Sequence, residues 1–401
     1  MMQNKTEQHS GTIDPVATQP AEEILKGFSW FAHMRANAPV IYDWQVNIWH
    51  VFRYDDVYQV ITDHDTFSSE NVPNFSENLF LRDTIVARNP PDHRRLRHLI
   101  NQAFTKRAIT HMEDSIRQLT QEMLTKLLSQ GKMDVVSDLA MPLTTNMIAA
   151  MLEIPFEDWH LVARWVKGTD GDTPPQNPKE IASVHNRLGQ EMYDYIADLL
   201  RERRRNPREG LITALSTASN EDGVLSDDEL LKFCVLLLVA GQETMQNLIV
   251  NTLYCLMKFP ESYAQLRQQP ALMPGAIEEV LRYLPPFWVS VRRTLVDTIV
   301  GQQAIPANAI INAWNASANH DSQYFSEPER FDIQRRPNRH LSFGHGVHFC
   351  LGAPLARLEA SIILPMLLNQ LKNVQPDPAI PTQITDGPLH HIRSLPIMFE
   401  V

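Results

Sequence analysis

FGHGVHFCLG, residues 343–352, is the stretch that decides the fold. It sets one cysteine, Cys350, among three glycines, just ahead of an expected long helix that begins near Pro354 and runs to about Leu371. Glycine allows a tight turn and a close approach to a flat ligand, and proline suits the first turn of a helix. The free N–H groups at a helix entrance favour a thiolate. A thiolate in this position could bind haem iron.

Two other interpretations of Cys350 stay open on the residues alone. A single cysteine in an apolar stretch is often a buried small hydrophobic residue. Cys350 could instead join His345 and His348 as a zinc ligand, but a structural zinc site needs a fourth ligand. No partner Cys–His pair stands out elsewhere in the sequence.

A long apolar helix is predicted between Ser226 and Phe259. The stretch SDDE, residues 226–229, forms a capping box at its start, and at 1.5 Å per residue the helix is about 50 Å long. Its middle contains AGQET, residues 240–244. Glycine inside a helix costs about 1 kcal/mol relative to alanine, and an acid and a hydroxyl in an apolar stretch need partners. On the sequence alone, the favoured role of this glycine is packing against another helix.

Two charged motifs carry pairs of residues that share a helix face. PDHRRLR, residues 91–97, places His93 and Arg97 four residues apart, and EVLR, residues 279–282, places Glu279 and Arg282 three apart. A basic cluster or an exposed Glu–Arg pair is usually a solvated surface feature that contributes little to stability. Taken singly, neither motif indicates a function.

Together and in this order, the motifs resemble those of the cytochrome P450 family. The pattern FxxGxHxCxG over residues 343–352 resembles the family's haem-binding signature, which is long and specific. The likeness covers nearly all of the chain after about Trp30 and is closest to soluble bacterial members. It implies a mainly α fold with a small β portion near the N-terminal part, in a single triangular domain over residues 21–401. Short strands around residues 40–51, 289–294 and 299–311 agree with that expectation.

The resemblance implies haem b as the cofactor and Cys350 as the ligand of its iron. It also implies that Thr244 hydrogen-bonds dioxygen, that Glu243 relays protons from solvent, and that both lie with Gly241 in an oxygen-binding groove. One haem propionate is expected to bind an arginine in the stretch VRRT, residues 291–294. Arg292 is assigned to it, but the adjacent Arg293 stays open as the alternative. The implied contacts to the rest of the haem are Ala240, Phe343, Gly344 and Gly352, and those to its propionates are His93, Arg97, Arg292 and His348.

A structural network is implied around Glu279 and Arg282. Arg330, from PERF at residues 328–331, is assigned as its third member, and the network is expected to fix the loop that carries Cys350. Two stretches depart from the family pattern. NHD at residues 319–321 replaces the frequent Asn-Arg-Asp and is expected to affect surface structure only. HHIRSLP at residues 390–396 lacks a glycine often seen there, which is expected to affect the substrate pocket.

Five segments are implied to determine substrate specificity: residues 68–87, 165–176, 233–240, 286–291 and 389–392. Their apolar character predicts a lipophilic substrate such as a fatty acid, terpenoid, steroid or macrolide, and the sequence does not rank these classes. The residues expected to line the pocket are Phe75, Leu79, Leu81, Val235, Leu236, Val239, Phe287, Trp288, Val289 and Ile392.

The implied reaction is monooxygenation, in which one atom of O2 enters the substrate and the other becomes water. Electrons are expected from NAD(P)H through a separate ferredoxin or flavodoxin and its reductase. A basic docking face for such an acidic partner is predicted at Arg94, Arg95, Lys106, Arg107 and Arg357. One alternative is a peroxygenase driven by hydrogen peroxide, against which the intact Glu243–Thr244 pair argues. Another is a non-enzymatic haem–thiolate sensor, although no output module is evident.

Composition limits the remaining possibilities. The chain has 401 residues, a net charge of -11 and three cysteines. Its acidity argues against general nucleic-acid binding, and the cysteines are too few for a disulfide framework, which favours a reducing cytoplasm. Residues 1–20 are expected to form a polar tail that is neither a signal peptide nor a membrane anchor. The most apolar run, residues 233–241, is too short to span a bilayer, so a soluble protein is expected. It is also expected to be a monomer.

Overall fold

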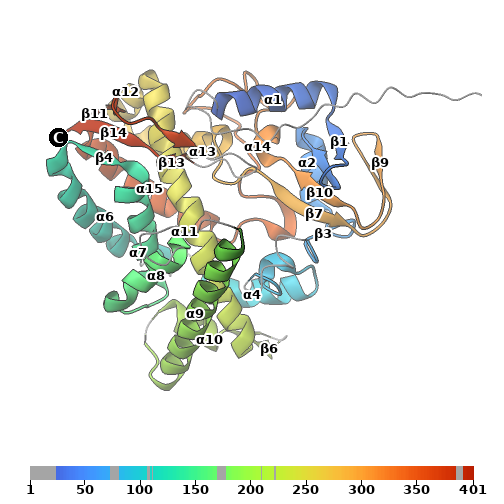
Figure 1. Cartoon of the computed structure of the whole chain (residues 1–401), viewed down its shortest axis with the longest axis horizontal. Coiled ribbons are helices and arrows are strands. Elements are labelled where there is room, and N and C mark those ends of the chain that lie inside the picture. Colours follow the sequence, from blue (N-terminus) through green and yellow to red (C-terminus); the bar gives the residue numbers. More distant parts are fainter. Residues whose placement is uncertain are drawn as a thin grey trace, which may run out of the picture.

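Helix α11 (Asp227–Lys258) runs through the middle of the molecule, with most other helices on one side and a five-stranded sheet on the other (Figure 1). This computed structural model describes residues 24–72, 81–105, 109–110, 112–168, 178–208, 210–220, 223–384 and 392–401. The predicted capping box is confirmed: Ser226 accepts a hydrogen bond from the amide of Glu229, and the Glu229 carboxylate accepts one from the amide of Ser226.

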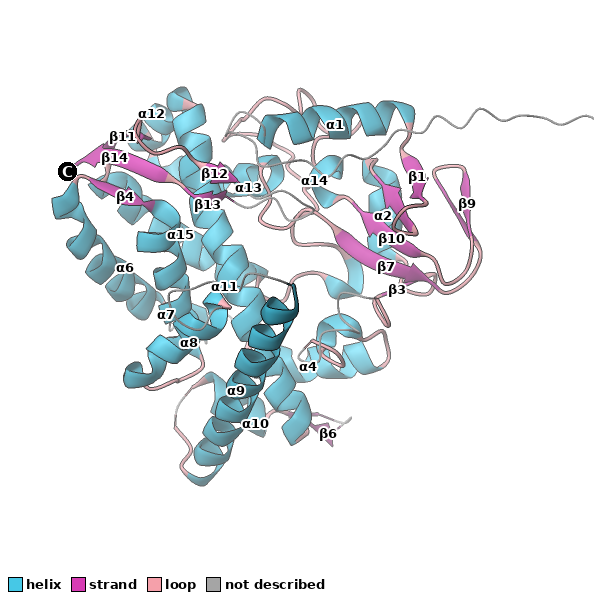
Figure 2. Ribbon diagram, in the orientation of Figure 1, coloured by secondary structure: helices cyan, strands magenta, loops and turns pink. Residues whose placement is uncertain are grey.

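Helices make up most of the described chain (Figure 2). The short helical turns are η2 (Ile85–Ala87), η3 (Leu128–Gln130), the π-helical η4 (Val135–Ala140), η5 (Phe156–Asp158), η6 (Pro270–Leu272) and η7 (Gly346–His348). The other α-helices are α1 (Ile24–Asn37), α2 (Tyr54–Thr62), α4 (Asp92–Ala103), α6 (Glu113–Leu127), α7 (Met141–Met151), α8 (Trp159–Lys167), α9 (Pro178–Arg205), α10 (Leu211–Thr217), α12 (Pro260–Gln268), α13 (Met273–Tyr283), α14 (Asn315–Ala318) and α15 (Ala353–Gln370).

The main sheet joins strands that lie far apart in the sequence. Its order is β1 (Val40–Asp43), β2 (Ile48–Val51), β10 (Ile310–Ala313), β7 (Ser290–Thr294) and β3 (Phe67–Ser68). Strand β10 runs parallel to β2, and β7 pairs antiparallel with β10. The short strands predicted around residues 40–51 are therefore confirmed as β1 and β2, and α2 follows them.

Smaller sheets complete the β portion. A three-stranded sheet has the order β11 (Lys372–Pro376), β14 (Pro396–Glu400) and β4 (Lys132–Asp134). The two-stranded ladders are β5 (Ser219–Asn220) with β6 (Gly223–Val224), β8 (Thr298–Val300) with β9 (Gln303–Ile305), and β12 (Gln383–Ile384) with β13 (Ile392–Ser394). The mainly α fold with a small β portion is thus confirmed.

The two ends of α11 belong to different apolar cores. Its N-terminal half packs with α4, α7, α8, α9 and α10, and its C-terminal half with α1, α6, α13 and α15. By length and composition α11 is the only helix among the described residues that could cross a membrane, yet 61% of its most apolar window is buried inside the protein. Such burial is expected of the central helix of a folded core.

Candidate active site

The cysteine loop, residues 341–352, holds Cys350 at the entrance to helix α15. The amide of Cys350 donates a hydrogen bond to the carbonyl of Phe343 at 2.8 Å, which closes the loop on itself. Gly344 and Gly346 have φ values of 66° and 70°, in the left-handed region that favours glycine. A Cβ atom on Gly346 would lie 3.3 Å from the Cα atom of Thr62, at the end of α2. These two glycines are therefore needed for the turn and for its close packing.

Cys350 differs from the other two cysteines in its exposure. It is partly exposed, whereas Cys234 and Cys255 are buried, and burial raises the pKa of the Cys234 thiol to about 12. Burial also raises the pKa of Cys350, and the amides of Gly352 and Ala353 and the guanidinium of Arg97 offset only part of that rise. Within the described ranges, no three His, Cys, Asp or Glu side chains converge as metal ligands. Among these residues the zinc alternative has no ligand set.

The middle of α11 is exposed although the helix on either side of it is buried. The exposed residues are Val239, Ala240, Glu243 and Thr244, whose spacing places them on one helix face. The Thr244 hydroxyl donates a hydrogen bond to the carbonyl of Ala240 at 2.8 Å. An exposed patch inside a core helix is free to line a ligand cavity, and this patch contains the acid and the hydroxyl that the sequence singled out.

Gly241 and Gln242 contact helix α7. A Cβ atom on Gly241 would lie 3.1 Å from the Cδ1 atom of Ile148, so this glycine permits a close helix–helix contact, as the sequence alone favoured. The buried side chain of Gln242 donates to the Oγ1 atom of Thr144 at 3.1 Å and to the Oε1 atom of Gln246. Sequence reasoning missed Gln242, whose side chain joins α11 to α7.

A cationic cluster joins helix α4, strand β7 and the cysteine loop. The rings of His93 and His348 lie 4.4 Å apart between centroids, and Arg97 donates to the carbonyl of Phe349 at 2.7 Å. Burial, followed by the charges of Arg292 and His93, lowers the pKa of His348 to about 2. Burial lowers the pKa of Arg292 to about 10.

Two buried nitrogen atoms in this cluster, Nδ1 of His93 and Nε2 of His348, have no hydrogen-bond partner. No carboxylate among the described residues forms an ion pair with His93, Arg97, Arg292 or His348. Buried polar atoms without a hydrogen-bond partner, and a buried guanidinium such as that of Arg292 without a counter-ion, are costly. The cluster therefore fits an anionic ligand.

Comparison with known proteins identifies the family. Residues 17–160 and 174–388 match the family model described as cytochrome P450. The putative cytochrome P450 YjiB of Bacillus subtilis is 37% identical over 357 residues, which cover 88% of this chain and 89% of the relative. The chain belongs to the cytochrome P450 family.

Two further relatives have more informative names. The erythromycin C-12 hydroxylase of Saccharopolyspora erythraea is 36% identical, over 91% of this chain and 92% of its own. The crystal structure of CYP109E1 from Bacillus megaterium in complex with corticosterone has a TM-score of 0.88 at 34% identity, covering 95% of this chain and 100% of that one. This P450 is accordingly a monooxygenase that uses haem b.

The residues present fit haem b. Cys350 is a partly exposed residue on a loop tight enough to approach a flat macrocycle, and the cationic cluster offers partners for two propionates. The structure also separates Arg292 from Arg293. Arg292 is buried and acts electrostatically on His348, whereas Arg293 on the next position of β7 contacts the carbonyl of Glu70 and the Oδ1 atom of Asn308.

The network expected around Glu279 forms in the protein interior. Glu279 and Arg282 are both fully buried and share two hydrogen bonds of 2.8 and 2.9 Å. Arg282 also donates to the carbonyl of Asn319, whose side-chain oxygen accepts the amide of Leu341 at 2.7 Å. Leu341 begins the cysteine loop, so the network is connected to that loop through backbone and amide hydrogen bonds.

The assignment of Arg330 to this network was wrong. Its side chain is 63% exposed and reaches Glu327, and only its backbone carbonyl accepts from the network. The third guanidinium belongs to Arg335, which lies 3.2 Å from the Oε1 atom of Glu279 and is 10% exposed. The sequence feature that could have indicated Arg335 is the group of three arginines among residues 335–339, shortly before the cysteine loop.

The expectation that residues 319–321 affect surface structure only was also wrong. Asn319 and His320 are fully buried, and Asp321 is 5% exposed. The His320 ring stacks on Phe28 with centroids 4.2 Å apart, and its Nε2 atom lies 2.9 Å from the carbonyl of Tyr283. An imidazole can occupy this position because its ring stacks on Phe28 and its N–H can donate a hydrogen bond to the buried carbonyl of Tyr283.

The residues expected to line the substrate pocket fall into three groups. Phe75 and Leu79 lie outside the described residues. Val239 and Phe287, 44% and 41% exposed, and the partly buried Leu81 retain surface that can face a ligand. The remaining five pack in the apolar cores instead: Val235, Leu236, Trp288, Val289 and Ile392.

Trp288 shows how these side chains are packed. A side chain that lines an open cavity keeps exposed surface, but Trp288 is fully buried. Its ring stacks on Phe28 and packs against Phe31, each with a centroid distance of 5.7 Å. The sequence shows that Trp288 is apolar, but only the tertiary structure shows which apolar surface it contacts.

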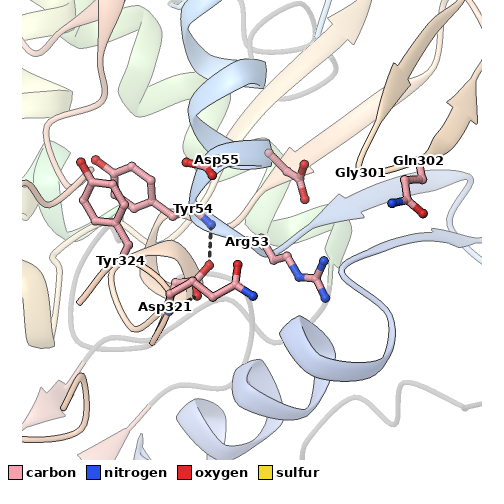
Figure 3. A pocket seen from close by; sticks show the side chains of 9 residues that line it. Arg53, Tyr54, Asp55, Gly301, Gln302, Asp321 and Tyr324 are labelled. Carbon is pink, nitrogen blue, oxygen red and sulfur yellow. Dashed lines mark hydrogen bonds between the residues drawn. The ribbon is translucent and has the colours of Figure 1, made fainter. Parts of the chain in front are cut away.

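A separate polar pocket of about 250 Å³ lies at the start of α2, between the turn after β8 and the segment after α14 (Figure 3). Its walls include Arg53, Asp56 and Asp321, and the amide of Tyr54 donates to the Oδ2 atom of Asp321 at 2.9 Å. None of its lining residues belongs to the cysteine loop, α4 or α11. This pocket is therefore not part of the candidate active site.

Proposed function

We propose that this P450 binds haem b through Cys350 and inserts one atom of O2 into a lipophilic molecule of steroid or macrolide size. The observation that carries the proposal is the exposed face of α11, where Val239 and Ala240 adjoin Glu243 and Thr244 inside an otherwise buried helix. Apolar surface beside an acid and a hydroxyl suits a site that holds a lipophilic substrate and delivers protons.

Haem b, when bound, supplies the iron at which dioxygen is activated. Thr244 would hold its hydroxyl proton on the exposed face of α11, where the proton can be donated to a molecule in the cavity. Its hydroxyl donates to the carbonyl of Ala240, and rotation about χ1 would redirect that proton toward an oxygen in the cavity. Glu243 is exposed next to it and is placed to pass protons from solvent. The same pair disfavours the peroxygenase alternative, because an enzyme that starts from hydrogen peroxide needs no such proton delivery.

The substrate class is inferred from apolar surface and from relatives. Val239 and Phe287 offer exposed apolar side chains, one relative is named an erythromycin hydroxylase, and one similar structure contains corticosterone. Polycyclic and macrocyclic substrates bury much apolar area without the ordering cost of a flexible chain. We therefore favour steroids and macrolides over fatty acids and small terpenoids.

Electrons are proposed to come from NAD(P)H through an acidic ferredoxin or flavodoxin and its reductase. An open groove of about 430 Å³ reaches the cationic cluster, and its lining residues are His93, Arg94, Arg97, His98, Asn101, Gln102 and Val347. Two of the arginines predicted for docking are already paired within this chain. Arg95 contacts Glu229, and Arg357 contacts Glu278. Lys106 and Arg107 lie outside the described residues, so the proposed docking face centres on Arg94.

A binding screen followed by turnover tests this proposal. Steroids and macrolides should shift the haem Soret band at lower concentrations than fatty acids of equal carbon number. With a ferredoxin, its reductase, NADPH and ¹⁸O2, the product should contain one ¹⁸O atom. Turnover with hydrogen peroxide alone at an equal rate would indicate a peroxygenase, and absence of any turnover across the library would indicate a sensor. Tighter binding of fatty acids would overturn the substrate class.

A further inference from the structure

Glu278, next to the buried Glu279, forms a second ion-pair network on the outer side of α13. Its carboxylate accepts two hydrogen bonds from Arg357, from Nε at 2.7 Å and from Nη2 at 2.8 Å. It also lies 3.1 Å from the Nε2 atom of His340. This fork geometry is the strong form of the Arg–carboxylate pair. Neither the haem signature nor the network around Glu279 includes Glu278.

The two partners of Glu278 lie on opposite sides of Cys350 in the sequence. His340 precedes the cysteine loop, and Arg357 follows it on the first turns of α15. The amide of Ser342 donates to the Nδ1 atom of His340, so the Nε2 atom of this imidazole is the one that carries the proton toward Glu278. One carboxylate on α13 therefore ties together the entry and the exit of the loop.

Arg357 also reaches the interior of the loop. Its guanidinium carbon lies 4.6 Å from the centroid of the Phe343 ring, within the range of a cation–π contact. Phe343 in turn accepts the amide of Cys350 through its carbonyl. The positive charge of Arg357 lowers the pKa of Cys350, and the cysteine raises that of Arg357, although burial and closer groups affect the thiol more. Arg357 is thus placed to act on the sulfur.

Glu278 is an anion at any working pH. Burial opposes its ionisation, but the hydrogen bonds from Arg357 and His340 prevail and lower its pKa to about 2. Its side chain is 29% exposed and that of His340 only 4%. The Arg357 side chain is 40% exposed, so the Glu278–Arg357 pair is partly buried and solvent screens it less than a fully exposed pair.

We propose that Glu278 is a positioning residue for the cysteine ligand: its carboxylate holds Arg357 and His340 at the two ends of the loop and offsets the positive field of Arg357 at the sulfur of Cys350. Charge near a haem thiolate sets the reduction potential of the iron. Glu278 would therefore lower that potential, and Arg357 would raise it. The inference rests on the proposed role of Cys350 as the iron ligand.

The test is the reduction potential of the purified holoenzyme, measured by spectroelectrochemistry without redox partner or substrate. Glu278→Gln removes a negative charge and should shift the potential in the positive direction. Arg357→Gln removes a positive charge and should shift it in the negative direction. The double variant Glu278→Gln/Arg357→Gln should return close to the wild-type value, because both charges of the pair are gone. Asp198→Asn, in an exposed pair with Arg201 on α9, makes the same charge change as Glu278→Gln in solvent and should not shift the potential.

Shifts of Glu278→Gln and Arg357→Gln in the same direction, or no shift in either, would overturn the inference, because loss of packing alone has no charge-dependent sign. If Glu278→Gln does not retain haem, the reduction potentials of Arg357→Lys and Arg357→Gln are compared instead, and this comparison tests the inference. Lysine keeps the positive charge, so Arg357→Lys should keep the reduction potential close to the wild-type value, whereas Arg357→Gln should lower it. The reduced carbon-monoxide spectrum separates the two levels of the proposal. A wild-type spectrum without the red-shifted thiolate Soret band would refute Cys350 as the ligand, whereas a normal band with unchanged potentials would refute Glu278 alone.

Discussion

At the scale of single residues, position on α11 decides which polar groups can react. Thr244 lies on the exposed face and donates to the carbonyl of Ala240, whereas Gln242, two residues away, is buried against α7. Thr244→Ala should leave haem content and the thiolate spectrum unchanged, because its side chain has no packing role in either core. Product formed per NAD(P)H consumed should fall several-fold, and hydrogen peroxide should rise, since proton delivery by a positioned acid contributes about 100-fold or more.

Thr144→Ala is the matched control for this change. Thr144 is a threonine on α7 that accepts a hydrogen bond from Gln242 and is almost fully buried. Its removal should reduce stability without diverting electrons to peroxide. Equal product yield in wild type and Thr244→Ala would show that Thr244 does not guide protons and would weaken the case for an O2-driven reaction.

At the scale of elements, buried charge networks connect α13 to the cysteine loop. Arg335, not Arg330, supplies the third guanidinium to Glu279, and it also donates to the carbonyls of Ser326 and Arg330. Arg335→Gln should lower the free energy of unfolding by about 2–3 kcal/mol, since hydrogen bonds to a buried charge are lost. Urea unfolding followed by haem absorbance and far-UV circular dichroism measures this difference.

Arg330→Gln provides the comparison. Its side chain is 63% exposed in a pair with Glu327, so its replacement should change the free energy of unfolding by less than about 0.5 kcal/mol. If Arg330→Gln destabilised the protein as much as Arg335→Gln, the assignment of the third network member to Arg335 would be refuted.

At the scale of the whole molecule, an acidic protein presents a local basic face. The net charge is -11, yet the lining of the groove that reaches the cationic cluster includes Arg94, Arg97 and His98. Arg94→Glu should slow reduction by an acidic ferredoxin at least several-fold, and the wild-type rate should fall as salt rises, because exposed charges are screened over about 8 Å at physiological ionic strength. Stopped-flow reduction under carbon monoxide measures both effects.

Arg117→Glu tests whether the location of the charge matters. Arg117 is exposed on α6, a helix that contributes no residue to the lining of the groove, and the same charge reversal there should leave the reduction rate nearly unchanged. Equal slowing by Arg94→Glu and Arg117→Glu would point to net charge rather than to a docking face. Indifference of the wild-type rate to salt would also contradict the proposal.

The sequence by itself determined the family, the cofactor and the order of the elements. Its glycines around Cys350, its capping box at Ser226 and its alternating residues at 40–51 are local signals, each with a local physical cause, and the structure contains the corresponding loop, helix and strands. Gly344 and Gly346 are the clearest case, because their left-handed backbone restricts the choice of residue whatever surrounds them.

Only the tertiary structure decided which side chains meet. Whether Trp288 faces a ligand or Phe28, whether Arg330 or Arg335 reaches Glu279, and whether Arg95 is free or paired depend on elements far away in the sequence. The sequence gives the charge and size of each side chain, but the packing of whole helices decides its partner. A shift of one position along a helix turns a side chain to a different face, where it meets different neighbours. For that reason the Glu278 network, which joins α13, the cysteine loop and α15, became visible only in the folded molecule.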